Sequence, residues 1–297
     1  MISIIIPTFN RSNSILVAIN SILNRCKKNI EIVIVDDASD DDTEQKIKSL
    51  NNQFITYVKN NSNIGTALSK LRGIEVASGD YIGFLDDDDI WTSNAIDLSS
   101  DINTNCDILL YDFKINHVQN SMSRLCSLQA YKKNFKHSVA KNMGTIFMQS
   151  SLFKKEFIML YKDRLDSKAT PSEDWDFFIY LAQKKPTIHY NKKVIFQWNL
   201  HKNSQSYNVE NETIALQYIL KKHLSFFKQY PKLLSQHYRI IGNRLYYEKK
   251  YNMGDEYIQK AFLIYPYKIK NLLLRFLAEF PIRYRRRLIN YYFKKIL

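Results

Sequence analysis

The sequence has 297 residues, 45% hydrophobic and 24% charged, which suits one main domain with a smaller appendage, or one large domain, and excludes a disordered or fibrous chain. Its net charge of +14 is uneven, because residues 210–297 alone carry 18 basic and 6 acidic side chains. No apolar run approaches the roughly 18 residues of a membrane-spanning helix, no leader pattern precedes the first strand, and the three cysteines show no metal-binding spacing. We therefore expect a cytoplasmic protein, whose basic segment would allow peripheral attachment to the inner face of the cell membrane.

Short apolar runs alternate with amphipathic stretches over the first 85 residues. The strands are expected at 2–6, 31–35, 54–58 and 81–85, and the helices at 13–23, 43–50 and 67–77. Strands of about five β-branched or aromatic residues are typical of a sheet buried on both faces. Their alternation with helices predicts right-handed crossovers and a mostly parallel sheet, in which ligands bind beyond the carboxyl ends of the strands.

The remaining elements predict two domains. Further strands are expected at 106–111, 145–148, 188–190 and 194–198, and a helix at 174–183. From about residue 210 onward the pattern is almost entirely helical. We therefore predict an α/β catalytic domain over residues 1–208 and a helical, basic C-terminal region over residues 209–297.

Three of the predicted strands stop in polar residues that would meet at one edge of the sheet. Residues 7–11 follow the first strand, Asp36 and Asp37 follow the second, and Asp86 to Asp89 follow the fourth. Four adjacent carboxylates repel one another in a desolvated cleft unless a cation lies among them. Mg²⁺ or Mn²⁺ would neutralise them and retain positions for substrate phosphates. The alternative is a solvated acidic turn, and Asp36-Asp37 alone would equally suit a helix cap.

Taken in order, these pieces resemble the family 2 glycosyltransferases of the GT-A fold over about residues 1–205. The segments that carry the resemblance are Pro7-Thr8-Phe9-Asn10-Arg11, Asp36-Asp37-Ala38-Ser39, Asn63-Ile64-Gly65, Ala77-Ser78-Gly79-Asp80, Phe84-Leu85-Asp86-Asp87-Asp88-Asp89 and Glu173-Asp174. One departure concerns the third helix, where the family often has Ala-Arg-Asn and this sequence has Ser69, Lys70 and Leu71. Lys70 would keep a positive charge near the donor diphosphate, but as a point charge rather than a fork.

The resemblance also implies a role for each site residue. The positions assigned to the nucleotide-sugar donor are Pro7, Thr8, Asn10, Asp37, Lys70, Asp86 and Asp87. Asp88 is expected to bind the divalent metal, Mn²⁺ or Mg²⁺, and His201 in the segment 198–204 is a second candidate ligand. Asp174 is expected to be the general base, although it would also suit the first turn of a helix.

The expected function is that of an inverting glycosyltransferase. It would transfer a sugar, most plausibly from a UDP-sugar, to a carbohydrate or lipid-linked glycan acceptor in surface polysaccharide biosynthesis. Two alternatives stay open. A metal-dependent nucleotide phosphohydrolase or nucleotidyltransferase also uses clustered aspartates, but it leaves the 7–11 and 173–174 segments unexplained. A non-catalytic sugar-nucleotide-binding scaffold would keep the donor site without turnover.

The basic C-terminal region suggests a second partner. Its cations alternate with aromatic residues at Arg283, Tyr284, Arg285 to Arg287, Tyr291, Tyr292, Phe293, Lys294 and Lys295. This composition suits either a solvated helical face or binding to an anionic membrane, where polyprenyl-diphosphate-linked acceptors would reside. No nucleic-acid-binding motif accompanies the charge, so we expect no nucleic-acid partner.

Overall fold

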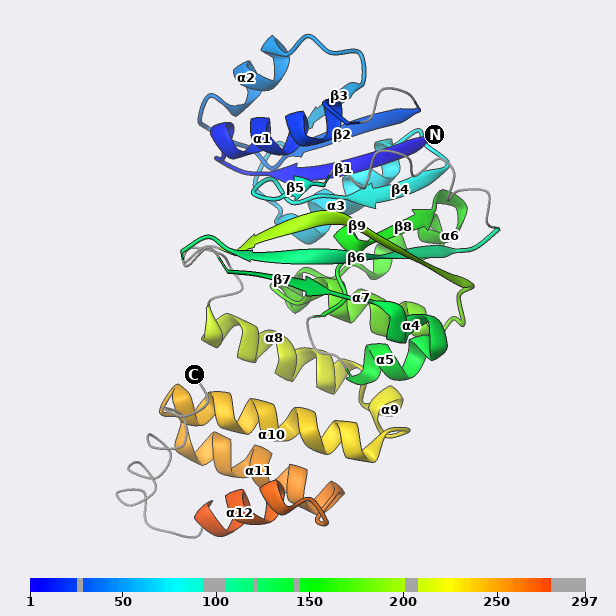
Figure 1. Ribbon diagram of the computed structural model, residues 1–297. Coiled ribbons are helices and arrows are strands. Elements are labelled where there is room, and N and C mark those ends of the chain that lie inside the picture. The colour runs from blue at the N-terminus through cyan, green and yellow to red at the C-terminus, as the bar shows by residue number, and fades with distance from the viewer. Residues whose placement is uncertain (26–28, 93–104, 120–121, 142–144, 201–207, 279–297) are drawn as a thin grey trace. The chain divides into compact units, whose positions relative to one another are not determined.

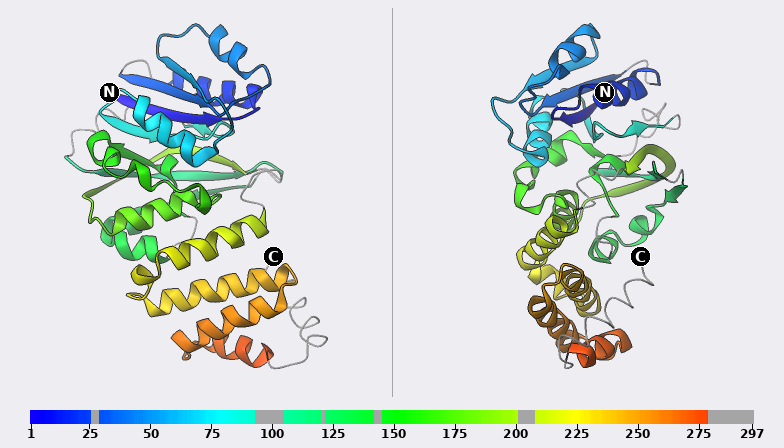
Figure 2. Two further views of the ribbon diagram at one scale, coloured as in Figure 1. Left: turned by 180° about the vertical axis from the view of Figure 1, so that it is seen from behind. Right: turned by 90° about the vertical axis from the view of Figure 1, so that its left-hand side faces the viewer.

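The computed structural model describes residues 1–25, 29–92, 105–119, 122–141, 145–200 and 208–278. The chain divides into two compact units. The first comprises Met1–Lys168 with Glu173–Ser204, and the second comprises Ala169–Ser172 with Gln205–Leu297. Figures 1 and 2 show the sheet of the first unit and the helices of the second. Among the described residues, no helix is both long and apolar enough to cross a membrane.

The first unit begins with four parallel strands. They are β1 (Ile2–Thr8), β2 (Ile30–Asp36), β3 (Ile55–Lys59) and β4 (Tyr81–Phe84). Strand β1 lies between β2 and β4, and β2 pairs in turn with β3. Every residue of β1 and of β4 is buried, as the unbroken apolar runs predict. The expected α/β sheet is confirmed, and its parallel strands end at one common edge.

The rest of the sheet is mixed. The strands β8 (Ser151–Lys154), β6 (Ile108–His117), β9 (Ile188–Leu200) and β5 (Ile90–Trp91) continue outward from β4 in that order, and β7 (Met122–Cys126) pairs with β6. Strand β8 is antiparallel to both β4 and β6, whereas β6 and β9 run parallel. One strand prediction was wrong: residues 145–148 do not form a strand, because a 3₁₀ turn at Met148–Ser150 precedes β8, which starts at Ser151. The strands expected at 188–190 and 194–198 are confirmed, but they are joined in the single strand β9.

Helices cover both faces of this sheet. The helices of the first unit are α1 (Ser12–Leu23), α2 (Thr43–Ser49), α3 (Thr66–Val76), α4 (Gln129–Lys133), α5 (Phe135–Lys141), α6 (Lys155–Met159) and α7 (Glu173–Ala182). Helices α1 and α3 lie on opposite faces of the parallel strands, as the front and back views show (Figures 1 and 2). Apolar residues of α1 at three- and four-residue spacing, such as Ile15, Ile19 and Ile22, are fully buried.

The second unit is helical in its described part. It contains α8 (Val209–Lys222), α9 (Leu224–Phe227), α10 (Pro231–Tyr247), α11 (Tyr251–Ile264) and α12 (Ile269–Ala278). Helices α10 and α11 approach closely where Gly242 faces Gly254 and the buried Ile258. A Cβ atom at Gly242 would lie 2.8 Å from Cδ1 of Ile258, so this helix crossing depends on the missing side chain.

Candidate active site

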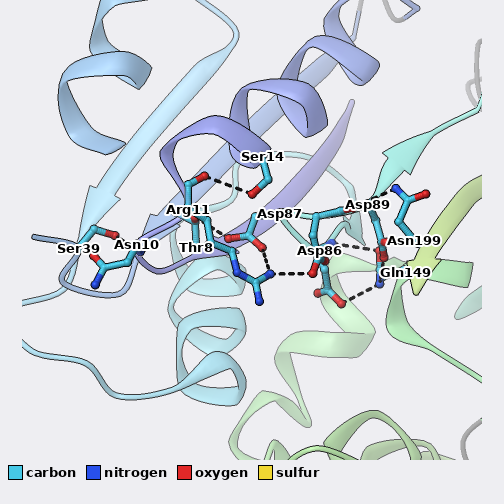
Figure 3. A network of polar contacts seen from close by, with 11 residues as sticks. Thr8, Asn10, Arg11, Ser14, Ser39, Asp86, Asp87, Asp89, Gln149 and Asn199 are labelled. Carbon is cyan, nitrogen blue, oxygen red and sulfur yellow. Dashed lines mark hydrogen bonds and ion pairs between the residues drawn. The ribbon is translucent and has the colours of Figure 1, made fainter. Parts of the chain in front are cut away.

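The acidic loop Asp86–Asp89 follows β4 at the edge where β1 also ends (Figure 3). The Thr8 hydroxyl at the end of β1 donates to Asp87 Oδ2 at 2.7 Å. Arg11 lies in the next turn, and its Nη1 atom is 2.7 Å from both Asp87 Oδ1 and Asp88 Oδ2. The side chain of Arg11 therefore places one positive charge between two neighbouring carboxylates of the loop.

Two residues from distant segments hold the other side of the acidic loop (Figure 3). The amide Nε2 of Gln149 donates to Asp86 Oδ2 at 2.8 Å and to Asp89 Oδ2 at 2.9 Å. Its Oε1 accepts the backbone N–H of Asp86 at 3.0 Å. Asn199 on β9 donates its backbone N–H to Asp89 Oδ1 and its side-chain amide to the carbonyl of Asp88. Neither side chain was assigned a role from the sequence: no local pattern around Gln149 suggests a site, and within the expected site segment 198–204 only His201 was singled out.

Burial changes the protonation of the loop. It raises the pKa of Asp86 to about 7, although the nearby Lys70 ammonium opposes the shift. Burial also raises the pKa of Asp87 to about 6, against the opposing effects of Arg11 and Thr8. The pKa of Asp89 is raised as well, by burial and by the neighbouring carboxylates. The donor-free loop therefore carries less negative charge near neutral pH than four ordinary aspartates would.

Asp174 lies in the first turn of α7, and both of its carboxylate oxygens have donors. Lys70 Nζ on α3 is 2.9 Å from Asp174 Oδ1, and the backbone N–H of Met148 donates to Oδ2 at 2.9 Å. Lys70 Nζ is also 3.5 Å from Glu173 Oε1. Lys70 thus contacts Asp174, the expected base, and the described contacts of the Lys70 ammonium are with carboxylates.

Asp37 is buried beyond the end of β2 and organises the turn into α3. Its Oδ1 accepts hydrogen bonds from Asn60 Nδ2 at 2.7 Å and from the backbone N–H of Ile64 at 2.9 Å. Its Oδ2 accepts the N–H of Gly65 at 2.8 Å. Gly65 has a φ of 87°, a left-handed conformation that glycine adopts without a Cβ penalty. Asp37 is therefore well positioned at the edge, with three donors already on its carboxylate.

The other predicted donor residues lie at the same edge. Pro7 is buried within β1, one residue before Thr8. Asn10 is exposed with a φ of 51°, and it exchanges hydrogen bonds with the turn after β2, through Ser39 Oγ and the N–H of Asp40. The candidate metal ligand His201 lies outside the described residues.

A metal would have to bind among residues that already have partners. Within the described ranges, no three His, Cys, Asp or Glu side chains are grouped closely enough to hold a metal ion. One acceptor is nevertheless free, because Asp86 Oδ1 is buried without a hydrogen-bond partner. Carboxylate oxygens are the ligands that Mg²⁺ and Mn²⁺ prefer. The loop therefore suits a hard divalent cation chemically, provided that substrate oxygens complete the coordination and Arg11 moves away from Asp88.

Comparison with solved structures identifies the fold. The chain superposes on the Staphylococcus aureus protein TarS in complex with UDP-GlcNAc with a TM-score of 0.66, at 16% identity, over 99% of this chain and 91% of that one. The mannosyltransferase PcManGT from Pyrobaculum calidifontis, in complex with GDP-Man and Mn²⁺, gives a TM-score of 0.57 at 14% identity, over 98% and 84% of the two chains. The architecture is the GT-A glycosyltransferase fold.

Sequence comparison then gives the family. Residues 3–98 match the model of glycosyl transferase family 2. An Escherichia coli protein, the UDP-Glc:alpha-D-GlcNAc-diphosphoundecaprenol beta-1,3-glucosyltransferase WfaP, is 40% identical over 96 residues, which are 32% of this chain and 38% of that protein. An uncharacterized glycosyltransferase of Rickettsia typhi is 30% identical over 215 residues, 68% of this chain and 64% of its own length. Residues 3–98 therefore form a glycosyl transferase family 2 segment, and the matched part of this chain spans 38% of WfaP and 64% of the Rickettsia protein.

Proposed function

We propose that the chain is an inverting glycosyltransferase that transfers a sugar from a UDP-sugar to a lipid-linked glycan in surface polysaccharide biosynthesis. The observation that carries this proposal is the position of Asp174. Its carboxylate is oriented by Lys70 and Met148, and Met148 directly precedes Gln149, which holds the acidic loop. Two adjacent residues thus contact the expected base and the acidic loop, and a fixed orientation of base and donor is what favours a single-displacement transfer.

The reaction proceeds in one displacement. Asp174 takes the proton of an acceptor hydroxyl, whose oxygen forms a bond to the anomeric carbon as the bond from that carbon to the diphosphate oxygen breaks. The configuration at the anomeric carbon is inverted as a result. In this proposal Thr8 and Asp37 bind the base of the nucleotide, and Asp86 to Asp88 bind on the side of its ribose and diphosphate. A Mn²⁺ or Mg²⁺ ion held by Asp88, with His201 as a further ligand, would neutralise the diphosphate charge.

The donor and acceptor classes are supported by relatives. Besides WfaP, a Campylobacter jejuni relative is named GalNAc(5)-diNAcBac-PP-undecaprenol beta-1,3-glucosyltransferase, and it is 38% identical over 98 residues. Both names describe transfer of glucose to an undecaprenyl-diphosphate-linked acceptor. We therefore propose UDP-glucose as the first donor to test, with an undecaprenyl-diphosphate-linked sugar as the acceptor.

The second unit would place the enzyme at the membrane that holds this acceptor. Helix α12 exposes Ile269 together with Leu272 and Leu273, which follow it by three and four residues, and Lys268 and Lys270 flank Ile269 in the sequence. An apolar stripe next to cations suits the surface of an anionic bilayer. The basic positions from Arg283 to Lys295 lie outside the described residues. Flotation with vesicles tests this attachment. Wild type should float with phosphatidylglycerol vesicles but not with phosphatidylcholine vesicles, and a Leu272→Ser/Leu273→Ser variant should not float with either. Equal recovery of protein in these samples would refute the attachment.

Activity is tested by measuring release of nucleoside diphosphate from UDP-, GDP- and dTDP-sugars with the lipid-linked acceptor, in Mn²⁺, Mg²⁺ or EDTA. We expect metal-dependent turnover of one donor, with Asp174→Asn lowering kcat by about 10²–10⁴-fold while UDP binding is retained. Asp163→Asn changes an exposed aspartate of the same unit and is the matched control. An NMR assignment of the product's anomeric configuration tests inversion. Diphosphate release without acceptor would favour the phosphohydrolase, and donor binding without turnover would favour the scaffold.

A further inference from the structure

Lys70 is a buried cation in the first unit. Its side chain is 3% exposed, and the side chains of its two carboxylate partners, Glu173 and Asp174, are 9% and 14% exposed. By itself, burial lowers the pKa of an ammonium group, but the carboxylates of Asp174, Asp86 and Glu173 outweigh this effect and raise the pKa of Lys70. Lys70 therefore stays charged, and its charge compensates acidic groups of the protein itself.

Lys70 and the segment Met148-Gln149 connect Asp174 with the acidic loop. Lys70 fixes one oxygen of Asp174, and the backbone N–H of Met148 fixes the other. The residue after Met148 is Gln149, whose amide contacts Asp86 and Asp89. Two donors on opposite oxygens determine the plane of the Asp174 carboxylate, and the remaining lone pairs are left for an acceptor hydroxyl.

A lysine that binds the donor diphosphate would need different surroundings. To reach a phosphate oxygen, Nζ would have to leave Asp174 and Glu173, and these buried carboxylates would then lose their counter-ion. A cation that served the diphosphate would also be expected to reach solvent in the donor-free protein, whereas Lys70 is enclosed. Its surroundings suit a permanent partner of the base.

We propose that Lys70 is a positioning residue for the general base Asp174 and not a ligand of the donor diphosphate. This inference rests on the proposed glycosyl transfer. Lys70 holds the Asp174 carboxylate in a fixed orientation while the acceptor hydroxyl approaches, so its removal should slow the transfer step and leave nucleotide binding intact. The same geometry explains why a point charge suffices at this position, since Lys70 contacts each carboxylate through one nitrogen.

The test compares Lys70→Met, Lys70→Arg and wild type by calorimetric titration with UDP and by kcat for transfer at saturating donor. We expect Lys70→Met to lower kcat by about 10²-fold, near the lower limit for loss of a general base, with the Kd for UDP changed less than about threefold. Lys70→Arg should recover most of kcat, because a guanidinium can donate to the same oxygens. Lys48→Met, on the exposed side of α2, serves as the control for loss of a lysine.

Other outcomes overturn the inference in distinguishable ways. If Lys70→Met weakens UDP binding tenfold or more and retains kcat, Lys70 is a diphosphate ligand. If it changes neither quantity, Lys70 only fills space. If wild type itself transfers no sugar, the proposed function fails and this inference fails with it. Should Lys70→Met fold poorly, the variant Lys70→Met/Glu173→Gln removes one buried negative charge together with the cation, and it should fold yet remain slow in transfer.

Discussion

Gln149 offers a sharp test of how the acidic loop is held together. Its side chain makes three hydrogen bonds in the loop, one from the backbone N–H of Asp86 and two to the carboxylates of Asp86 and Asp89. The variant Gln149→Met keeps the approximate volume and removes all three. A hydrogen bond to a charged group contributes about 1.5–3 kcal/mol. We therefore expect the two carboxylate bonds alone to cost about 3–6 kcal/mol of unfolding free energy at pH 8.

The cost should fall at lower pH. Burial raises the pKa of Asp86 to about 7 and raises that of Asp89 as well, and loss of the amide donor would raise both further. A carboxyl group whose folded pKa lies above its unfolded value favours the folded state as it takes up a proton. The difference between Gln149→Met and wild type should therefore be smaller at pH 6 than at pH 8.

Urea unfolding followed by circular dichroism at pH 6 and pH 8 measures both effects. The control is Gln183→Met, because Gln183 is exposed and donates only to the backbone carbonyl of Ile179; its cost should stay within about 0.5 kcal/mol. A cost below about 1 kcal/mol for Gln149→Met at pH 8 would refute the reasoning, because it lies below the value of a single bond to a charged group. An equal cost at both pH values would show that the carboxylates do not respond to the lost donor.

Three further predictions follow from the same structure. Arg11→Met should increase the affinity for Mn²⁺ measured by electron paramagnetic resonance, because it removes the cation that competes for the acidic loop; unchanged or weaker binding would contradict this. In the donor-free wild type, Tm should fall between pH 5.5 and pH 8. The folded pKa values of Asp86 and Asp87, about 7 and about 6, lie above their unfolded values, so the stabilisation from their proton uptake is lost as pH rises. Mn²⁺ should make this fall in Tm less steep, and a Tm that rises with pH would contradict the prediction. Gly242→Ala should lower the free energy of unfolding by about 1–3 kcal/mol through overpacking. Ile258→Val deletes the contacting Cδ1 atom, so the double variant should regain part of this stability. Additive losses of stability in urea unfolding would argue against the contact.

The parallel half of the sheet could be predicted from the sequence because its signals are local. An unbroken apolar run such as Ile2–Thr8 allows little besides a buried strand, and the observed bounds lie within two residues of those expected. The acidic loop was located for the same reason, since it directly follows the apolar strand β4. Parallel strands then bring their carboxyl ends together without further information.

Partners from distant segments could not be predicted in this way. Gln149 lies 63 residues from Asp86, and Asn199 lies 110 residues from Asp89, so only the folded chain reveals their contacts. Lys70 was expected near the diphosphate because of its place in a motif, and that role stays a prediction; its contact with Asp174, 104 residues away, could not be predicted from the motif. The strand expected at 145–148 was wrong because the apolar residues there suit a strand, whereas the backbone turns at Met148. This turn lets the N–H of Met148 donate to the distant Asp174.

The wide spacing of these contacts bears on how the protein is synthesised and recombined. Residues 1–98 contain the segment that matches the family model, yet they lack Gln149, Asp174 and Asn199. On a ribosome, the first four strands emerge long before β8 and β9 can join them, so Asp86 and Asp89 would lack their contacts with Gln149 and Asn199 while the chain grows. A gene fusion made near residue 98 would transplant a donor loop without its supports. The shortest segment that contains residues 3–98 together with all of these contacts is therefore about twice as long as the segment that matches the family model.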